Sequence, residues 1–313
     1  MLIFHKSFYV CYLKFNNNFG YNSTMYPKSF EYISPNNIDD VISLLDKYKE
    51  DAKLISGGHS LIPLMKLRLV SPQIIVDLNN VSGYNNIALN QDTLSIGSRV
   101  THHEIEISNL LKEKCYILTE AAALIGDPQV RNVGTIGGAL AQADPAGDWG
   151  SVMLSLNAEF KVKGKNGERL IKPIDFFKDY YETDLTYDEI LTEININAPD
   201  KSQGGAYLKL ERKIGDFATV GIAVQLSVKK NHIDNIGIGL TAVSNTPIKA
   251  IKSEEFLLNK EITDNNIIET ANITAQNSDP SDDIRGSAEY KKAMVKEFTI
   301  RAIKLSIKRC NGD

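Results

Sequence analysis

The sequence predicts an α+β protein with two domains. Its 313 residues are enough for two domains of ordinary size. Over the first two thirds of the chain, short apolar strands and helical patterns are interspersed. In the last third the strands come first and the helices follow, which is typical of an α+β domain. A polar, glycine-containing stretch at 199–205 separates the two patterns, so we expect one domain over 25–200 and a second over 201–313.

The composition excludes several classes of protein. Hydrophobic residues make up 42% of the chain and charged residues 24%, and the net charge of −4 comes without a basic stripe, so we expect no nucleic-acid partner. No apolar run approaches the roughly 18 residues of a membrane helix. Cys11, Cys115 and Cys310 are too widely separated for a disulfide framework, a zinc site or an iron–sulfur ligand set. We expect a cytoplasmic protein that binds no metal itself.

The first 24 residues differ from the rest of the chain. A short apolar patch at 8–13 is followed directly by Lys14, and no small-residue cleavage site is present, which argues against a signal peptide. Ordered-looking sequence begins after Met25, at Tyr26-Pro27. We expect 1–24 to be an extension outside the first domain, or the product of a start codon placed too early.

The first domain is predicted to begin with a helix. Five apolar residues after Ser34-Pro35 recur at three- and four-residue spacing: Ile38, Val41, Ile42, Leu45 and Tyr48. Runs of apolar residues predict strands at 53–56, 74–78 and 93–97. Further helices are expected over 101–111 and 119–125.

A turn at Asn166-Gly167 predicts a β-hairpin, and alternation predicts a strand over 189–194. The second domain is expected to hold three strands and then three helices. The strands are predicted at 206–210, 219–228 and 233–243, and the helices at 254–258, 264–276 and 287–309.

Two glycine pairs are the strongest functional signal. They lie in Ser56-Gly57-Gly58-His59-Ser60 and in Thr135-Ile136-Gly137-Gly138-Ala139. Glycine lets the backbone approach a ligand closely, and successive N–H groups in such a turn form an anion-binding nest. Neither segment has the spacing of a P-loop, and a fold with one glycine-rich turn before a helix also fits poorly. Two nests predict a ligand with two phosphates.

Several segments, taken in order, give the chain a resemblance to a known family. They are the first glycine loop continued to Arg68, the stretch from Gly126 through the second loop to Asp148, Lys213-Ile214-Gly215-Asp216-Phe217-Ala218, and Arg285-Gly286-Ser287-Ala288-Glu289-Tyr290. From Tyr26 to the last helix the sequence resembles the medium, FAD-binding subunit of molybdenum hydroxylases. That group contains aerobic carbon monoxide dehydrogenase, aldehyde oxidoreductases and xanthine dehydrogenase.

The resemblance implies a PCMH-type FAD-binding fold of two α/β subdomains, followed by a C-terminal α+β domain of antiparallel strands and helices. It places the glycine loops at the diphosphate and Asp148 near the ribityl chain, and valine at Gly58 or Gly137 is expected to fill the diphosphate approach. No catalytic residue is expected, because the flavin performs the redox chemistry. The implied FAD contacts are Leu54, Ile55, Ser56, Gly57, Gly58, His59, Ser60, Leu61, Ile125, Thr135, Ile136, Gly137, Gly138, Ala139, Asp148, Leu191 and Lys209.

The function implied by the resemblance is electron transfer. Electrons leave a molybdenum site on a large molybdopterin-binding subunit, cross [2Fe-2S] clusters on a small iron–sulfur subunit, reach the FAD here and pass to an external acceptor. The molybdenum cofactor and the iron–sulfur clusters are expected on the partners only. The expected assembly is a doubled heterotrimer, an (LMS)2 heterohexamer. The sequence leaves the substrate and the acceptor open.

The alternative is a self-contained flavin-dependent reductase or oxidase of the same superfamily. The reductase type needs an Asn-Ala-Gly segment where this chain has Ala143-Asp144-Pro145-Ala146-Gly147-Asp148. A scaffold that has lost FAD is a third alternative, against which the intact glycine loops argue. In related oxidases a Gly-Gly-His histidine bonds FAD covalently, although a structural His59 is the favoured interpretation.

Three other patterns have simpler interpretations than they first suggest. The adjacent His102 and His103 cannot share a helix face, so they predict a solvated helix start and not a metal site. Gly237-Ile238-Gly239-Leu240-Thr241-Ala242 matches a nucleotide fingerprint but lies in a predicted strand, so we interpret it as a chance match. Asp144 is expected to have a turn or cap role and not to form a catalytic pair with Asp148.

Overall fold

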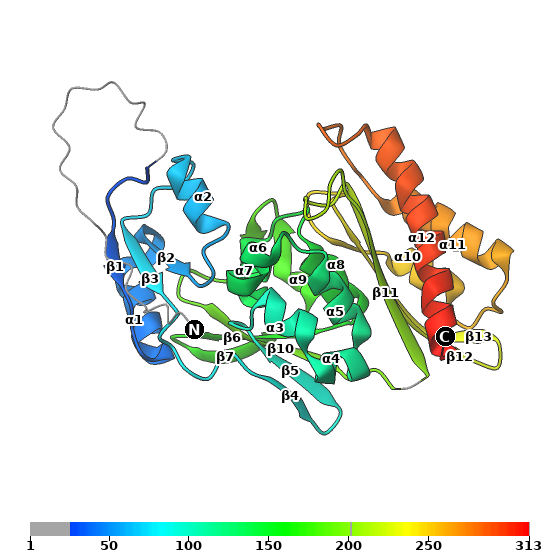
Figure 1. The fold of residues 1–313 in the computed structure, drawn as a ribbon, viewed down its shortest axis with the longest axis horizontal. Helices are drawn as coiled ribbons and strands as arrows, with labels where there is room; N and C mark the ends of the chain where they lie inside the picture. The colour runs from blue at the N-terminus through cyan, green and yellow to red at the C-terminus, as the bar shows by residue number, and fades with distance from the viewer. Residues whose placement is uncertain (1–25, 201, 313) are drawn as a thin grey trace, which may run out of the picture.

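The computed structural model describes residues 26–200 and 202–312, so the expectations for 1–24 lie outside the described residues. Within these residues the strands form three sheets and a two-stranded ribbon, and the sheets follow one another along the long axis of the molecule (Figure 1). Within the described residues no helix is long and apolar enough to cross a membrane.

The first sheet is small and parallel. Its strands run in the order β1 (Glu31–Ile33), β3 (Ile74–Asp77) and β2 (Ala52–Ile55). Helix α1 (Ile38–Tyr48) has the predicted bounds and begins at Asn37, whose side chain accepts a hydrogen bond from the Asp40 N–H. The apolar face of α1 packs on this sheet through Val41, Ile42 and Leu45. A 3₁₀ turn, η2 (Lys49–Asp51), leads into β2, and β2 ends at the first glycine loop.

The second sheet is antiparallel and has the order β4-β5-β10-β6-β7. Its strands are β4 (Ile87–Asn90), β5 (Thr93–Gly97), β10 (Ile190–Asn197), β6 (Glu159–Gly164) and β7 (Gly167–Ile171). The predicted Asn166-Gly167 hairpin is confirmed between β6 and β7, with Gly167 at φ 111°. The short ribbon β8 (Phe177–Asp179) and β9 (Glu182–Thr183) follows helix α9 (Pro173–Phe176).

Helices cover one side of this second sheet. They are α3 (His102–Ile107), α4 (Asn109–Lys114), α5 (Tyr116–Ala123), α6 (Pro128–Val133), α7 (Ile136–Gln142) and α8 (Asp148–Ser155), and α2 (Leu61–Lys66) follows the first glycine loop. The single helix predicted over 101–111 is wrong. Ser108 adopts an extended conformation (ψ 114°), and its hydroxyl caps α4 by accepting from the Leu111 N–H.

The third sheet is antiparallel and runs in the order β11 (Gln203–Leu210), β12 (Val220–Lys229), β13 (His232–Thr241) and β14 (Ile248–Lys249). Helices α10 (Ile251–Leu257), α11 (Asp264–Asn277) and α12 (Ala288–Cys310) follow the strands, as predicted. Ile222 and Val224 on β12 join the apolar core of this domain, whereas Ala223 belongs to the core of the second sheet and its helices. The third sheet is therefore buried on both faces, with α8 against β13 and β12.

The glycines of the apparent nucleotide fingerprint explain this close packing. A Cβ at Gly237 would lie 2.0 Å from the Ser155 carbonyl oxygen, and one at Gly239 would lie 1.9 Å from that of Ser151. Strand β13 thus lies directly on the backbone of α8, and only glycine permits that approach. The interpretation as a chance match is confirmed, because these glycines serve packing between the two domains.

Replacing Gly239 with alanine is expected to lower the free energy of unfolding by about 3 kcal/mol, because the new methyl group overpacks a backbone contact that cannot shift freely. Asp234→Ala is the matched control, since Asp234 is an exposed residue of the same strand, and we expect a change of at most about 0.5 kcal/mol there. Urea unfolding followed by far-UV circular dichroism measures both. Equal stability of the two variants would contradict the assigned packing.

Candidate functional site

A cavity of about 310 Å³ lies where the first glycine loop, the second glycine loop, the start of α8 and a loop of the second domain meet. All but three of the predicted FAD contacts line it; Ile136, Gly137 and Leu191 do not. The lining residues that the prediction did not include are His102, Gly126, Val130, Gly134, Gln142, Asp144, Gly147, Trp149, Gly215, Asp216 and Phe217.

The two glycine loops touch each other. A Cβ at Gly57 would lie 2.3 Å from the Val133 carbonyl oxygen, so this position admits only glycine. The Thr135 hydroxyl donates to the Ser56 hydroxyl oxygen at 3.2 Å. Two segments far apart in the sequence therefore form one continuous wall of the cavity.

The first loop presents free donors. The consecutive backbone N–H groups of residues 57–61 have no acceptor among the residues that the structure describes, and the first helical bond runs from the Ile62 N–H to the Gly58 carbonyl. Gly58 has φ 75°, which a residue with a side chain rarely adopts. Unsatisfied N–H groups in such a turn stabilise an anion, so the first nest is present as predicted.

The second loop differs from its prediction. The N–H groups of Ile136 and Gly137 donate to the carbonyl oxygens of Val100 and Ser98, at 3.0 and 2.9 Å. The Gly138 N–H donates to the Thr135 hydroxyl oxygen at 3.2 Å, and the Ala139 N–H bonds the Thr135 carbonyl. The expectation of a second free nest is therefore wrong, because this loop uses its donors to begin α7 and to bond the segment at 98–100.

The expectation that a valine at Gly137 fills the diphosphate approach is also wrong. A Cβ at Gly137 would lie 2.6 Å from the Ser98 carbonyl oxygen, so a side chain there would collide with the core and not enter the cavity. Ile136 is fully buried in the core, and Leu191 is 4% exposed within β10, where it is paired with Val162. These three positions therefore do not line the cavity.

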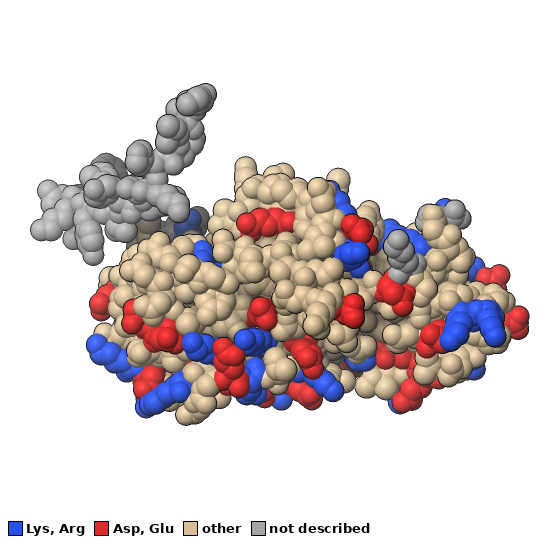
Figure 2. All heavy atoms as spheres, turned by 90° about the horizontal axis from the view of Figure 1, so that it is seen from below, with Lys and Arg blue, Asp and Glu red and all other residues tan. Residues whose placement is uncertain are grey.

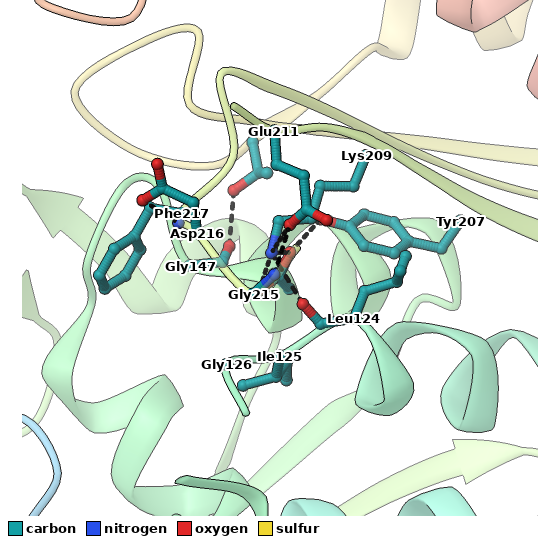
Figure 3. A network of polar contacts seen from close by, with 12 residues as sticks. Leu124, Ile125, Gly126, Gly147, Tyr207, Lys209, Glu211, Gly215, Asp216 and Phe217 are labelled. Carbon is teal, nitrogen blue, oxygen red and sulfur yellow. Dashed lines mark hydrogen bonds and ion pairs between the residues drawn. The ribbon is translucent and has the colours of Figure 1, made fainter. Parts of the chain in front are cut away.

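A buried polar cluster lies at the cavity where α8 begins (Figure 3). Asp148, at the start of α8, is 7% exposed and accepts from the Tyr207 hydroxyl at 2.6 Å. Lys209 donates to Asp148 at 3.3 Å and to the Leu124 carbonyl at 2.9 Å. Burial raises the pKa of Asp148, an effect that the Lys209 charge opposes, and burial together with Asp148 raises the pKa of Tyr207 well above its usual value.

Asp144 lies nearby but makes a turn. Its side chain accepts from the Ala146 N–H at 2.9 Å, and its carbonyl accepts from the Gly147 N–H at 2.9 Å. The predicted turn role is confirmed. Burial raises the pKa of the Asp144 carboxyl.

The second domain supplies the last wall through a loop at 211–217. Glu211 accepts from the Gly215 N–H at 3.2 Å, which folds the loop back on itself (Figure 3). Gly215 has φ 82°, and a Cβ there would lie 2.5 Å from the Gly126 carbonyl oxygen. Asp216 pairs with Arg285 at 3.1 Å and with Arg212 at 3.0 Å, and these guanidinium groups lower its pKa to about 2. Residues 213–217 belong to a segment that carries the family resemblance, but no FAD contact was predicted there.

His102 corrects another expectation. It is 4% exposed, so the helix start is not solvated at this position, whereas the side chain of His103 is 41% exposed. The Trp149 indole N–H donates to His102 Nδ1 at 3.2 Å, which provides the buried imidazole with a partner. The sequence alone does not place these two residues together, since they are 47 positions apart.

The described residues contain no group of three or more histidine, cysteine, aspartate or glutamate side chains arranged to hold a metal ion. The cavity offers instead a row of N–H donors, glycines at close backbone approaches and a buried acid–base pair. That donor set fits a dinucleotide with a diphosphate.

Comparisons with known proteins agree with this geometry. Residues 28–199 match the family model "FAD binding domain in molybdopterin dehydrogenase", and residues 205–305 match the "CO dehydrogenase flavoprotein C-terminal domain". The carbon monoxide dehydrogenase medium chain of Hydrogenophaga pseudoflava is 36% identical over 91% of this chain and 100% of its own length. That of Afipia carboxidovorans is 39% identical over 89% of this chain and 97% of its own.

Solved structures give the same result. The chain matches a structure of carbon monoxide dehydrogenase from Hydrogenophaga pseudoflava with a TM-score of 0.90 and 37% identity, covering 91% of this chain and 100% of that one. It also matches quinoline 2-oxidoreductase from Pseudomonas putida 86 with a TM-score of 0.85 and 32% identity, over 92% of this chain and 99% of that one. The chain therefore belongs to the FAD-binding family of the molybdopterin dehydrogenases.

Proposed function

We propose that the cavity holds FAD with its diphosphate against the first glycine loop and its ribityl chain toward Asp148 and Lys209. The observation that carries this proposal is the row of N–H groups at 57–61, which have no acceptor among the described residues. Such a row binds a diphosphate without an arginine or lysine clamp. Most of the contacts implied by the family resemblance line the cavity, which supports FAD binding at this site.

The two matched family models support a division of labour between 25–200 and 201–313. In this proposal the first domain supplies both glycine loops and Asp148. The second domain supplies Lys209 and the loop at 211–217, and so closes the cavity from the other side. FAD bound here requires both domains, because the Asp148–Lys209 contact crosses between them.

The chain is the FAD-binding, electron-transferring subunit of a molybdenum hydroxylase. Bound FAD supplies the two-electron redox chemistry that no side chain of this protein has. We propose that electrons arrive from iron–sulfur clusters on a small partner subunit and originate at a molybdenum site on a large one. They leave to an external acceptor, so the organic or gaseous substrate is oxidised on another chain.

We propose an (LMS)2 heterohexamer in the cytoplasm, supported by the similarity to proteins named as medium chains. Lysine and arginine are interspersed with aspartate and glutamate along one edge of the face shown in Figure 2, next to a broad uncharged area. Several large apolar side chains are exposed, among them Ile214 at 95% and Ile284 at 80%. Such residues suit contacts with other subunits.

Purification of the tagged chain from its native host tests the proposed assembly. We expect FAD, molybdenum and iron in one complex with two further chains. Native mass spectrometry should give a mass twice that of the heterotrimer. A single yellow chain that oxidises NADPH without partners would contradict it and favour the self-contained reductase. Acid precipitation tests whether FAD is covalently bound to His59, because release of all the flavin into the supernatant excludes such a bond.

Gly58→Ala is expected to lower the affinity for FAD at least tenfold, because both its positive φ and its place in the nest depend on glycine. Gly83→Ala is the matched control, since Gly83 also has a positive φ (93°) but lies outside the cavity. Both variants should lose about 1 kcal/mol of stability. Flavin fluorescence titration measures the affinity, and an equal effect of the two variants on it would contradict the loop assignment.

Asp148→Asn is expected to weaken FAD binding about tenfold, since it removes a charged hydrogen-bond acceptor. It should also lower the free energy of unfolding by about 3 kcal/mol, because Lys209 is 1% exposed and loses a buried counter-charge. Asp39→Asn is the control, since Asp39 pairs with Lys163 at the surface with 78% exposure, and such a pair contributes at most about 1 kcal/mol. Unchanged FAD affinity in the Asp148→Asn variant would contradict the assignment of Asp148 as a FAD contact.

A further inference from the structure

His102 is held in one orientation at the wall of the cavity. It is the first residue of α3, and its backbone N–H donates to the Gly134 carbonyl at 2.9 Å. An isolated β-bridge between Thr101 and Thr135 aligns the start of α3 with the second glycine loop. His102 is 4% exposed and lines the cavity. Backbone contacts on one side and burial on the other leave the ring little freedom.

The contact with Trp149 decides which nitrogen carries the proton. An indole N–H can only donate, so His102 Nδ1 must accept the 3.2 Å hydrogen bond with its lone pair. A neutral imidazole with an unprotonated Nδ1 carries its hydrogen on Nε2. If Nδ1 were protonated as well, its N–H would face the indole N–H of Trp149, and two donors would point at each other. Burial, with the neighbouring charges of His59 and Arg131, lowers the pKa of His102 to about 4, so the ring is neutral near pH 7.

The resulting Nε2–H donor has no acceptor in the part of the chain that the structure describes, and Nε2 is not among the fully enclosed unpartnered atoms there. Nε2 lies close to Gly134, since a Cβ added to this glycine would be 3.0 Å from it. Gly134 and Thr135 border the first loop through the Thr135–Ser56 contact. The free donor therefore lies beside Gly134 and the second glycine loop, which contacts the first loop.

We propose that His102 Nε2–H donates a hydrogen bond to a diphosphate oxygen of the dinucleotide, and that Trp149 sets the tautomer that makes this possible. The inference rests on the proposed FAD site and adds a side-chain donor to the backbone donors at 57–61. It also gives the second glycine loop a role, since the N–H groups of that loop are engaged within the protein. Gly134 is then required because any side chain would press on the donating edge of the ring.

Affinity measurements with ADP and with FAD test the contact. His102→Phe should weaken both ligands about tenfold, because both contain the diphosphate and the variant leaves one anionic oxygen without a donor. His102→Gln should retain most of the affinity, since its amide nitrogen can reach the same place. His103→Phe is the matched control, since His103 is the next residue of the same helix but does not line the cavity, and it should bind as the wild type does. Unchanged ADP affinity in a folded His102→Phe variant would overturn the proposal.

Nitrogen-15 NMR of the unsubstituted chain provides a second test that does not depend on a variant folding. The sequence has five histidines, so their ring signals can be resolved. We expect His102 to show the Nε2–H tautomer without ligand, and its Nε2 and proton signals to shift when ADP is added. An Nδ1–H tautomer, or unshifted His102 signals in a sample that binds ADP, would overturn the proposal. If neither ADP nor FAD binds, the proposed function fails instead.

Discussion

The cavity depends on the contact between α8 and β13, where backbone lies on backbone. Gly237 and Gly239 let the strand approach the helix so closely that any Cβ would overlap a carbonyl oxygen of α8. The same contact fixes the first turn of α8 against the second domain, where Thr241 donates to the Gly147 carbonyl at 2.6 Å. Asp148 is thereby placed within hydrogen-bond distance of Tyr207 and Lys209, and the two domains are joined at the cavity.

Further close backbone contacts join the loops around the cavity. Gly57 packs against the Val133 carbonyl, and Gly215 packs against the Gly126 carbonyl. Both contacts are too close for a side chain at the glycine. The three loops that surround the cavity therefore meet through their backbones. Backbone contacts shift less readily than those of long side chains, so the cavity is largely formed before a ligand arrives, which lowers the entropic cost of binding.

The polar groups at the cavity fall into two sets, one neutral and one charged. At the glycine loops the donors are neutral: backbone N–H groups at 57–61 and an imidazole that burial and Trp149 keep uncharged. The charged set is Asp148 and Lys209, which form a buried pair, with Glu211 3.5 Å from the lysine. We expect the proposed diphosphate contact to depend little on salt, because these donors carry no charge.

Local signals in the sequence predicted local structure well. The apolar spacing after Ser34-Pro35 gave the bounds of α1, and Asn166-Gly167 gave the hairpin, because the interactions that form both lie within a few residues. The first glycine loop was also predictable, since a strand that ends in two glycines can present free donors by itself. Ser108 was the exception, because a serine can either continue a helix or cap the next one.

The wrong predictions at the site arose because the contacts that decide them join residues far apart in the sequence. Gly137 and Gly58 look alike in the sequence, but only the fold shows that Gly137 faces Ser98 and that its N–H is already used. His102 resembles the first residue of a solvated helix until Trp149 is brought beside it. A glycine or histidine in a motif therefore indicates that a constraint exists, and only its neighbours in space tell whether that constraint comes from the ligand or from the protein.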